Sequence, residues 1–350
     1  MPAIKKPSEY FNTVLYSGAN PSSQTVGVGF QPDFVWIKSR TQTYGHYLFD
    51  VVRTPTFGLI TNSTDGDSTG DALTFTANGF TTTASAGATN DPTGAPNNFI
   101  CYNWKAGGAA VTNTSGTISS QVSVNQTAGF SIVAWTGNGS SSATVGHGLG
   151  AVPGLIICKE RSTTGEYWHV KHKSTASNTN LFLNVQNGST SAASVGDGIL
   201  GDLNSSTTFG FATAGSPGNV VAVNENGVTN IAYCWSEVPG YSSFGSFTGN
   251  GASDGPFIYT GFRPEFIIYK RTDNTSDWWL LDTIRGPINS AGTYFFPNSN
   301  SIGGTDAPWI DFVSNGFKLR GRTDPNTNGN GATYIYAAFA EAPFKYANAR

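Results

Sequence analysis

Hydrophobic and polar residues alternate over short stretches along the whole chain, and no stretch carries the spacing of an amphipathic helix. The alternating stretches are rich in β-branched and aromatic residues and are bounded by Gly, Asn, Pro and Ser. This period of two is typical of half-buried strands joined by turns. Asn78-Gly79 and Asn315-Gly316 add a dipeptide that favours tight hairpin turns. The pattern therefore predicts an all-β protein.

The same pattern occurs three times. Its clearest landmark is a Gly, a Pro three residues later and a Lys six residues after the Pro, in GFQPDFVWIK, GAVPGLIICK and GFRPEFIIYK. The three prolines are Pro32, Pro153 and Pro264. Each copy closes on an alternating strand, ICYNW, IAYCW or IYAAF, one face of which we expect in the core. A spacing repeated three times predicts three diverged copies of one module.

Many short strands in each copy are typical of a β-sandwich or jelly roll. We therefore expect three tandem modules of this kind, with a connector rich in Gly, Ala, Ser and Thr after the first. The predicted segments are an N-terminal arm (1–9), module 1 (10–108), the connector (109–128), module 2 (129–240), module 3 (241–344) and a C-terminal tail (345–350).

Two modules share an Asp-x-x-Arg motif, formed by Asp50 with Arg53 and by Asp282 with Arg285. Module 2 reads WHVKHKS here, which puts Lys171 at the predicted place of the Asp. Residues three apart lie on opposite faces of a straight strand, so these side chains can meet only at a strand end or bulge. We interpret each Asp as the cap of a turn and each Arg as a tie between a loop and the sandwich. Half of a binding or catalytic site is the alternative.

Three groups of side chains raise the question of metal or redox chemistry. His169 and His172 lie in a strand-like stretch that points them to opposite faces, which prevents a shared metal. The loop TNSTDGDSTGDA has carboxylates but lacks the closing Glu of a calcium loop, so we predict a solvated turn. Cys101, Cys158 and Cys234 form no CxxC pair and occupy different repeat positions, as small core residues do. We predict neither a metal nor a cofactor.

Aromatic residues beside loops are the candidate ligand contacts. Trp168, Trp279 and Tyr47 align in one repeated column, which favours core packing. Trp278 stands outside that column, and Tyr44 lies near the corresponding place in module 1. Because the C–H face of a sugar ring stacks on an aromatic ring, Trp278 and Tyr44 are the predicted glycan contacts.

Composition narrows the class of protein. Charged residues make up 12% of the chain and aromatic residues 13%, the reverse of a disordered chain. The 19 basic residues are scattered and the net charge is −3, so we expect no nucleic-acid partner. No apolar run is long enough to span a membrane, and the first residues lack the apolar core of a secretory signal. No nucleophile elbow, zinc-protease motif or nucleotide-binding loop occurs, and we predict that the chain is not an enzyme.

Stretches from Tyr10 to Lys345 resemble a family of repeat proteins encoded by marine bacteriophages and related viruses. They include YFNTVLYSGAN, VGFQPDFVWIKSR, LFDVVR, FICYNWKAGGAA, AGFSIVAWTGNGSSSATVGHGLG, IAYCWSEVPGYSSFGSFTGNG, TGFRPEFIIYKR and YIYAAFAEAPFK. The resemblance implies a virion structural or tail-fibre-like protein and supplies no catalytic residues. This chain departs from the family pattern at VVRTPTFG, where Arg-Gly is more typical, and in the missing Asp and Arg of module 2.

Three functions follow as hypotheses. The first is a virion component, tail-fibre-like or capsid-decorating, assembled in the host cytoplasm and released by lysis, with residues 1–9 as a docking arm and three sandwiches projecting outward. Its expected partners are other virion proteins, further copies of itself as a trimer, and a host-surface glycan. The second is a carbohydrate-binding module. The third, a polysaccharide-degrading tail enzyme, is disfavoured because no acid/base pair of carboxylates stands out.

Overall fold

The computed structural model describes most of the chain, and nearly all of its regular structure is strand. Strands account for 45% and helices for about 2%, which confirms the all-β prediction. Its short helices are η1 (Pro7–Glu9) and α2 (Pro325–Asn328), and neither is long and apolar enough to cross a membrane. The described residues are 4–94, 96, 98–191, 199–212, 222–286, 289–321 and 323–341. The predicted C-terminal tail and the start of the N-terminal arm lie outside them.

Module 1 consists of two packed antiparallel sheets. One has the strand order β1-β8-β3-β4-β5 and the other β2-β7-β6. Apolar side chains such as Val35, Ile37 and Phe80 fill the space between them. The strands are β1 (Phe11–Tyr16), β2 (Gln24–Gly27), β3 (Phe34–Ser39), β4 (Tyr47–Asp50), β5 (Leu59–Ile60), β6 (Leu73–Thr76), β7 (Gly79–Thr82) and β8 (Phe99–Trp104).

Module 2 repeats this plan with a wider main sheet, β16-β15-β14-β13-β19-β11-β10-β9, and a second sheet, β12-β18-β17. Residues 109–128, predicted to be a connector, supply β9 and β10 of that main sheet, and Val122 of β10 is buried in a core cluster of module 2. The strands are β9 (Val111–Asn113), β10 (Ser120–Asn125), β11 (Phe130–Thr136), β12 (Thr144–Gly146), β13 (Leu155–Glu160), β14 (His169–His172), β15 (Thr179–Phe182), β16 (Thr190–Ser191), β17 (Ile199–Leu200), β18 (Thr208–Ala212) and β19 (Thr229–Trp235).

Module 3 joins the two sheets into one. Its strand order is β20-β27-β22-β23-β24-β25-β26-β21, and the pairing of β24 with β25 links the two halves into a near-closed, barrel-like sheet. The strands are β20 (Ser242–Thr248), β21 (Asp254–Tyr259), β22 (Pro264–Arg271), β23 (Trp278–Asp282), β24 (Asn289–Phe295), β25 (Gly304–Val313), β26 (Gly316–Arg320) and β27 (Thr333–Ala340).

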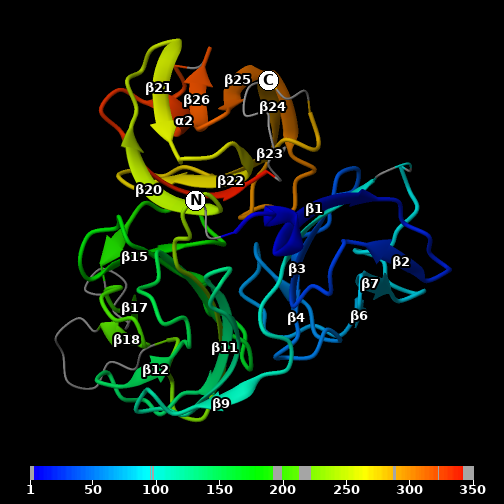
Figure 1. Cartoon of the computed structure of the whole chain (residues 1–350), viewed down its shortest axis with the longest axis vertical. Helices are drawn as coiled ribbons and strands as arrows, with labels where there is room; N and C mark the ends of the chain where they lie inside the picture. The colour runs from blue at the N-terminus through cyan, green and yellow to red at the C-terminus, as the bar shows by residue number, and fades with distance from the viewer. Residues whose placement is uncertain are drawn as a thin grey trace.

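Figure 1 shows the three modules, in three colour ranges, grouped around one centre. Apolar side chains from all three modules form one shared hydrophobic core. Trp104, Trp235 and Phe339 stand at equivalent positions, each paired with the same position of the neighbouring strand (Phe34, Leu155 and Phe266), and their rings contact one another. The ring centroids lie 6.0 Å (Trp104–Trp235), 5.4 Å (Trp104–Phe339) and 6.4 Å (Trp235–Phe339) apart. These three rings mark an internal pseudo-three-fold axis.

This shared core differs from the expected row of sandwiches that project outward. The reason is that the central strands are buried on both faces. Every residue of β3, β8 and β13 is buried. One face of each strand packs inside its own module and the other packs against the neighbouring modules. Exposing the second face to water would remove the favourable burial of its apolar side chains.

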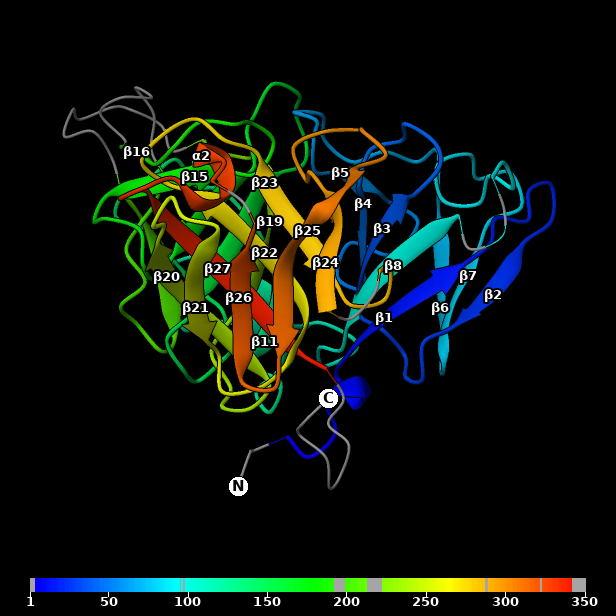
Figure 2. The same cartoon turned by 90° about the horizontal axis from the view of Figure 1, so that it is seen from above.

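The chain ends and the loops around the repeated lysines lie at opposite ends of the body (Figure 2). The first and last described segments, η1 and the end of β27, lie at one end. The opposite end is formed by two loops from each module, and we call this end the crown. The crown loops are 40–46 and 61–70 of module 1, 161–168 and 183–189 of module 2, and 272–277 and 296–303 of module 3.

Candidate functional site

The repeated lysines bind neighbouring modules together beneath the crown. All three are fully buried, and each donates a hydrogen bond to a backbone carbonyl oxygen of the preceding module in the cycle, from module 1 to 3, 2 to 1 and 3 to 2. The three bonds are Lys38 Nζ to Asn300 O (3.0 Å), Lys159 Nζ to Thr64 O (3.1 Å) and Lys270 Nζ to Gln186 O (3.1 Å). Burial lowers the pKa of Lys38 and of Lys270 to about 7. The lysine that identified the repeat in the sequence therefore joins the modules in cyclic order.

Tryptophans make a second set of bonds between modules. The Trp168 indole N–H donates to Ile60 O at 3.0 Å, from module 2 to module 1. The Trp278 indole N–H donates to Phe182 O at 2.8 Å, from module 3 to module 2. The equivalent residue of module 1 is His46, whose ring packs edge-on against Phe295 of module 3.

These contacts correct the prediction for Trp278. Tyr269 and Cys158 are equivalent, because each directly precedes the repeated lysine. Strand pairing places Trp279 opposite Tyr269 and His169 opposite Cys158. Trp168 therefore matches Trp278 in the repeat rather than Trp279. Successive residues of a strand point to opposite faces, which sends Trp278 into the shared core with only 3% of its surface exposed. A sugar ring cannot stack on it there.

Tyr44, the other predicted glycan contact, is half-buried in the crown loop 40–46. Its hydroxyl donates to Asp91 Oδ2 at 2.8 Å, and its backbone carbonyl accepts from Lys38 Nζ at 2.5 Å. Tyr44 thus has two structural contacts within module 1.

The Asp50/Arg53 pair closes the turn after β4 and lies at the boundary of modules 1 and 2. Arg53 Nε contacts Asp50 Oδ2 at 2.6 Å, and both side chains are completely buried. Asp50 Oδ1 accepts the backbone N–H groups of Val52 and Arg53 at 3.0 and 2.8 Å. The Tyr233 hydroxyl of module 2 donates to Asp50 Oδ2 at 2.8 Å. The bend of the chain after β4 explains how residues three apart in sequence meet.

The Asp282/Arg285 pair repeats this geometry between modules 3 and 1. Arg285 Nε contacts Asp282 Oδ2 at 2.6 Å, and the Tyr102 hydroxyl donates to the same oxygen at 2.7 Å. The Arg285 guanidinium lies 3.8 Å from the centroid of the Phe295 ring. Both pairs therefore join a carboxylate of one module to a tyrosine of the next.

The boundary between modules 2 and 3 lacks this arrangement. Phe34 pairs with Asp50 and Phe266 with Asp282, while the equivalent Leu155 pairs with His172. His172, and not Lys171 as predicted, therefore occupies the Asp position. Lys171 points to the opposite face of β14 and forms an ion pair with Asp202 at 2.8 Å.

The tyrosine of this boundary is missing as well. Ala337 stands where modules 1 and 2 have Tyr102 and Tyr233. A cavity of about 10 Å³ lies beside it, lined by residues that include His172 and Trp278. His172 Nε2 lies 3.1 Å from the backbone oxygen of Tyr336. Both members of the Asp–Tyr pair are thus replaced together.

The candidate metal ligands are separated from one another. Phe182 contacts the ring of His169, whereas Tyr336 contacts His172, and burial lowers the pKa of each histidine to about 3. Within the described ranges, no three His, Cys, Asp or Glu side chains are grouped as metal ligands would be.

The cysteines are buried thiols. Burial raises the pKa of the Cys101 thiol to about 12. Cys158 and Cys234 are buried too, and the three cysteines form no disulfide.

The carboxylates of the loop TNSTDGDSTGDA also have separate partners. Asp67 contacts Arg53 Nη1 at 2.8 Å and Arg161 Nε at 3.1 Å, across the boundary of modules 1 and 2. Asp71 is buried and accepts from the Thr89 hydroxyl at 3.1 Å, while Asp65 is exposed. The loop therefore does not converge on a cation.

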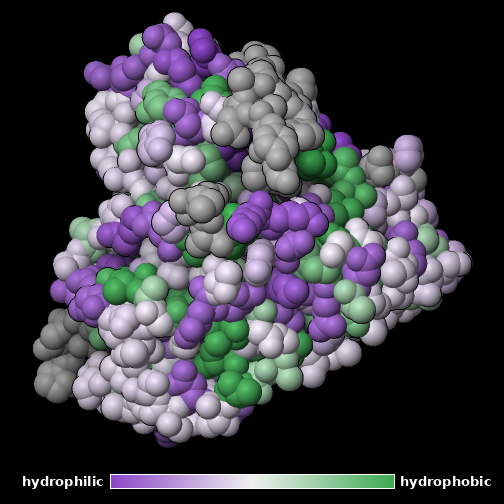
Figure 3. Space-filling model, viewed as in Figure 1, coloured by the Kyte–Doolittle hydropathy of each residue, from purple (hydrophilic) through white to green (hydrophobic). Residues whose placement is uncertain are grey.

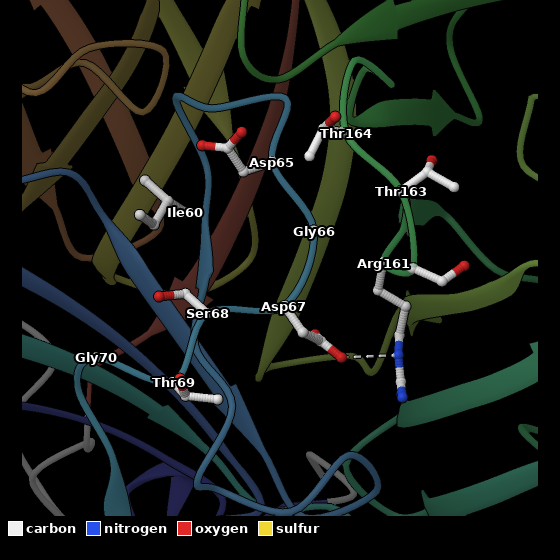
Figure 4. A pocket seen from close by; sticks show the side chains of 11 residues that line it. Ile60, Asp65, Gly66, Asp67, Ser68, Thr69, Gly70, Arg161, Thr163 and Thr164 are labelled. Carbon is white, nitrogen blue, oxygen red and sulfur yellow. Dashed lines mark ion pairs between the residues drawn. The ribbon is translucent and has the colours of Figure 1, made fainter.

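A cavity of about 500 Å³ opens between this loop and the loop after β13 (Figure 4). Its walls come from module 1 on one side and module 2 on the other, and Asp67 and Arg161 pair at its base. We call it the crown pocket. It is lined by Ile60, Asp65, Gly66, Asp67, Ser68, Thr69, Gly70, Arg161, Ser162, Thr163 and Thr164. Sequence reasoning missed this pocket because its two walls are far apart in the chain.

Comparison with known proteins identifies one family. Residues 6–343 match a family model described as a domain of unknown function, DUF7483. No curated protein and no solved structure matches the chain. Because the family model covers nearly the whole sequence, the chain belongs to the DUF7483 family.

Proposed function

We propose that the chain is a structural component of a bacteriophage particle, tail-fibre-like or capsid-decorating, that attaches near its chain ends and presents the crown outward. The observation that carries this proposal is the polarity of the body. Both described chain ends lie at one end of the pseudo-three-fold arrangement, and the crown loops lie at the other (Figure 2). The resemblance of the repeated motifs to marine bacteriophage proteins supplies the kind of particle.

The end that carries the chain ends has surface suited to docking. Figure 3 views the molecule from this side and shows small hydrophobic patches between hydrophilic ones. Val152, just before β13, and Ile284, just after β23, are 46% and 42% exposed. Exposed apolar side chains among polar ones are typical of surfaces that bind another protein.

The internal three-fold arrangement supports a role in a symmetric particle. The expected homotrimer would place three whole chains around an axis, and this chain already places three modules around an axis by itself. We propose that one chain supplies the three-fold shape that fibres and decorations usually obtain from three subunits.

Buried contacts between the modules favour a rigid scaffold over a catalytic one. The Asp50/Arg53 pair, which an enzymatic site would need to expose, is enclosed with both side chains at 0% exposure. Buried, satisfied polar networks fix a unique packing. On this basis we propose that the chain is not an enzyme.

Particle association tests the proposal. Particles from cells infected with the virus that encodes the chain are separated on a density gradient, and an antibody to the recombinant chain locates it by immunoblot and immunogold labelling. We expect the chain to sediment with infectious particles and to be labelled at regular positions, while a host cytosolic enzyme stays at the top of the gradient. Recovery of the chain only with that enzyme would overturn the proposal.

A further inference from the structure

The crown pocket has the size and position of a ligand site. Its volume of about 500 Å³ lies within the range of small-molecule sites. Such sites favour boundaries between structural units, and loops held by a rigid scaffold commonly carry binding residues. The crown pocket meets both conditions, because loops 61–70 and 161–168 follow strands of two modules that share one core.

Bonds between the two loops hold the pocket open in one shape. The Asp67 backbone N–H donates to Arg161 O at 3.0 Å, and the Gly165 N–H donates to Thr64 O at 3.1 Å. Lys159 Nζ holds the same Thr64 oxygen from below at 3.1 Å. A site that is already ordered before binding avoids the entropic cost of ordering loops on the ligand.

The charges in the walls are largely compensated. Asp67 lies between Arg53 and Arg161, and Arg53 is in turn paired with Asp50. Asp65 remains exposed at the pocket and accepts from the Ser63 hydroxyl at 2.7 Å. A compensated guanidinium and an exposed carboxylate disfavour phosphate or carboxylate ligands.

The remaining groups suit a ligand that both donates and accepts hydrogen bonds. Hydroxyls of Ser68, Thr69 and Thr164 can do either, and the Asp65 carboxylate accepts. Gly70 leaves the backbone of one wall open to a ligand, and the Ile60 side chain offers an apolar contact. Gly66 instead leaves room for the Arg161 carbonyl of the opposite loop.

We infer that the crown pocket binds a neutral saccharide, with the Asp65 carboxylate accepting a sugar hydroxyl between the walls of modules 1 and 2. The inference deepens the proposed function, on which it rests for its biological setting, because it gives the outward end of a particle protein a surface glycan as ligand. The binding site differs from the predicted one, since neither Trp278 nor Tyr44 lines the pocket.

Substitutions at the rim can fill the pocket without disturbing the fold. Gly70 has a backbone conformation open to any residue, and an added Cβ would meet nothing closer than Ser68 Oγ at 4.0 Å. Gly70→Trp therefore places a ring in the pocket, and Thr164→Trp does so from the opposite wall. Asp65→Asn removes the carboxylate charge. The matched control is Gly87→Trp, because Gly87 has open space around its Cβ position and lies outside the pocket.

The experiment measures binding to the purified full chain by saturation-transfer NMR and calorimetry. The probes are glucose, galactose, mannose, N-acetylglucosamine, N-acetylgalactosamine and their disaccharides, with N-acetylneuraminic acid, inorganic phosphate and calcium chloride as charged probes. We expect a neutral saccharide to bind the wild type and Gly87→Trp, about tenfold weaker binding in Asp65→Asn, and loss of binding in Gly70→Trp and Thr164→Trp. Near-ultraviolet circular dichroism verifies the fold of each variant.

Absence of binding by every neutral saccharide, binding of the charged probes alone, or unchanged saccharide binding in both folded tryptophan variants would each overturn the inference. The assay uses isolated protein, so its outcome is independent of particle association. A chain that sediments with particles but binds no saccharide refutes the pocket alone, whereas a saccharide-binding chain absent from particles refutes the proposed function alone.

Discussion

The Tyr233 hydroxyl of module 2 donates a 2.8 Å hydrogen bond to the buried Asp50 carboxylate of module 1. Tyr102 and Asp282 repeat this relationship between modules 1 and 3 at 2.7 Å. In each case the carboxylate already pairs with the arginine three residues later. Removing one member of such a group leaves a buried charge with fewer partners, so these contacts are sensitive points of the module boundaries.

Tyr233→Phe should destabilise the protein by about 1.5–3 kcal/mol, because the Asp50 carboxylate loses a hydrogen bond that water cannot replace. Urea denaturation followed by tryptophan fluorescence measures the change. Tyr241→Phe is the matched control, since the Tyr241 hydroxyl is buried and has no hydrogen-bond partner in the structure. Equal effects of the two substitutions would show that the bond to Asp50 contributes nothing.

Lys159→Met should cost about 1–3 kcal/mol of unfolding free energy, because the Glu166 carbonyl loses its bond to the ammonium group and the Thr64 carbonyl keeps only the Gly165 N–H. Lys6→Met serves as the control. Lys6 forms an exposed ion pair with Glu9, and exposed pairs contribute little to stability. A neutral Lys159→Met variant would contradict the assignment of this lysine as a tie between modules 1 and 2.

The boundary of modules 2 and 3 allows a test by restoration. His172→Asp and Ala337→Tyr should each destabilise the protein, the first by burying an unpaired carboxylate and the second by overfilling a cavity of about 10 Å³. Together they place an Asp and a Tyr as at the other boundaries. The destabilisation of the double variant should be smaller than the sum of the two single destabilisations, by about 1 kcal/mol or more in a double-mutant cycle. Strict additivity would mean that this boundary cannot accommodate the pair.

Stability should fall as the pH drops from about 6.5 to 4. Burial lowers the pKa of His147 to about 4 and of His169 and His172 to about 3, so all three are neutral in the folded protein. The unfolded chain takes up these protons below its histidine pKa of 6.5, which favours unfolding as the pH decreases. Each histidine contributes at most about 1.4 kcal/mol per pH unit, where it is protonated in the unfolded chain and neutral in the folded protein.

Glu265 acts in the opposite direction, because burial raises its pKa to about 7 and the folded protein holds that proton over much of the same range. Burial also raises the pKa of Asp33 and of Asp71, which act in the same direction as Glu265. Burial lowers the pKa of His46 as well, and we expect the four histidines together to outweigh these carboxyl groups. Urea denaturation at several pH values between 7 and 4 measures how the free energy of unfolding changes with pH. His169→Phe should reduce this slope by the contribution of one histidine. A stability that rises on acidification would refute the neutral state of these histidines.

The sequence alone determined the fold class and the repeat. Alternation with a period of two, together with turn residues, predicts strands wherever it occurs, because side chains of a strand point alternately to its two faces. The Gly-x-x-Pro spacing and the following lysine located equivalent strands in all three modules, and Pro264 begins β22. The Asp50/Arg53 and Asp282/Arg285 pairs were recognised as units for the same reason.

The predictions for Trp278 and Lys171 are wrong because the alignment of the three repeats is shifted by one residue at these strands. The repeated sequence pattern aligns Trp279 with Trp168 and puts Lys171 at the Asp position, whereas strand pairing assigns Trp278 and His172 to these positions. A shift of one residue reverses which face of a strand a side chain occupies. The shifted alignment therefore predicts exposure for Trp278, which is buried.

Only the tertiary structure decided that the three modules share a core, that Trp104, Trp235 and Phe339 meet on its axis, and that two distant loops enclose the crown pocket. The periodicity of a strand tells which residues share a face but not what covers that face. The covering here comes from residues far away in the sequence, such as Tyr233 on Asp50. Local patterns specify each strand, and the packing of apolar faces and buried polar groups between modules specifies how the strands assemble.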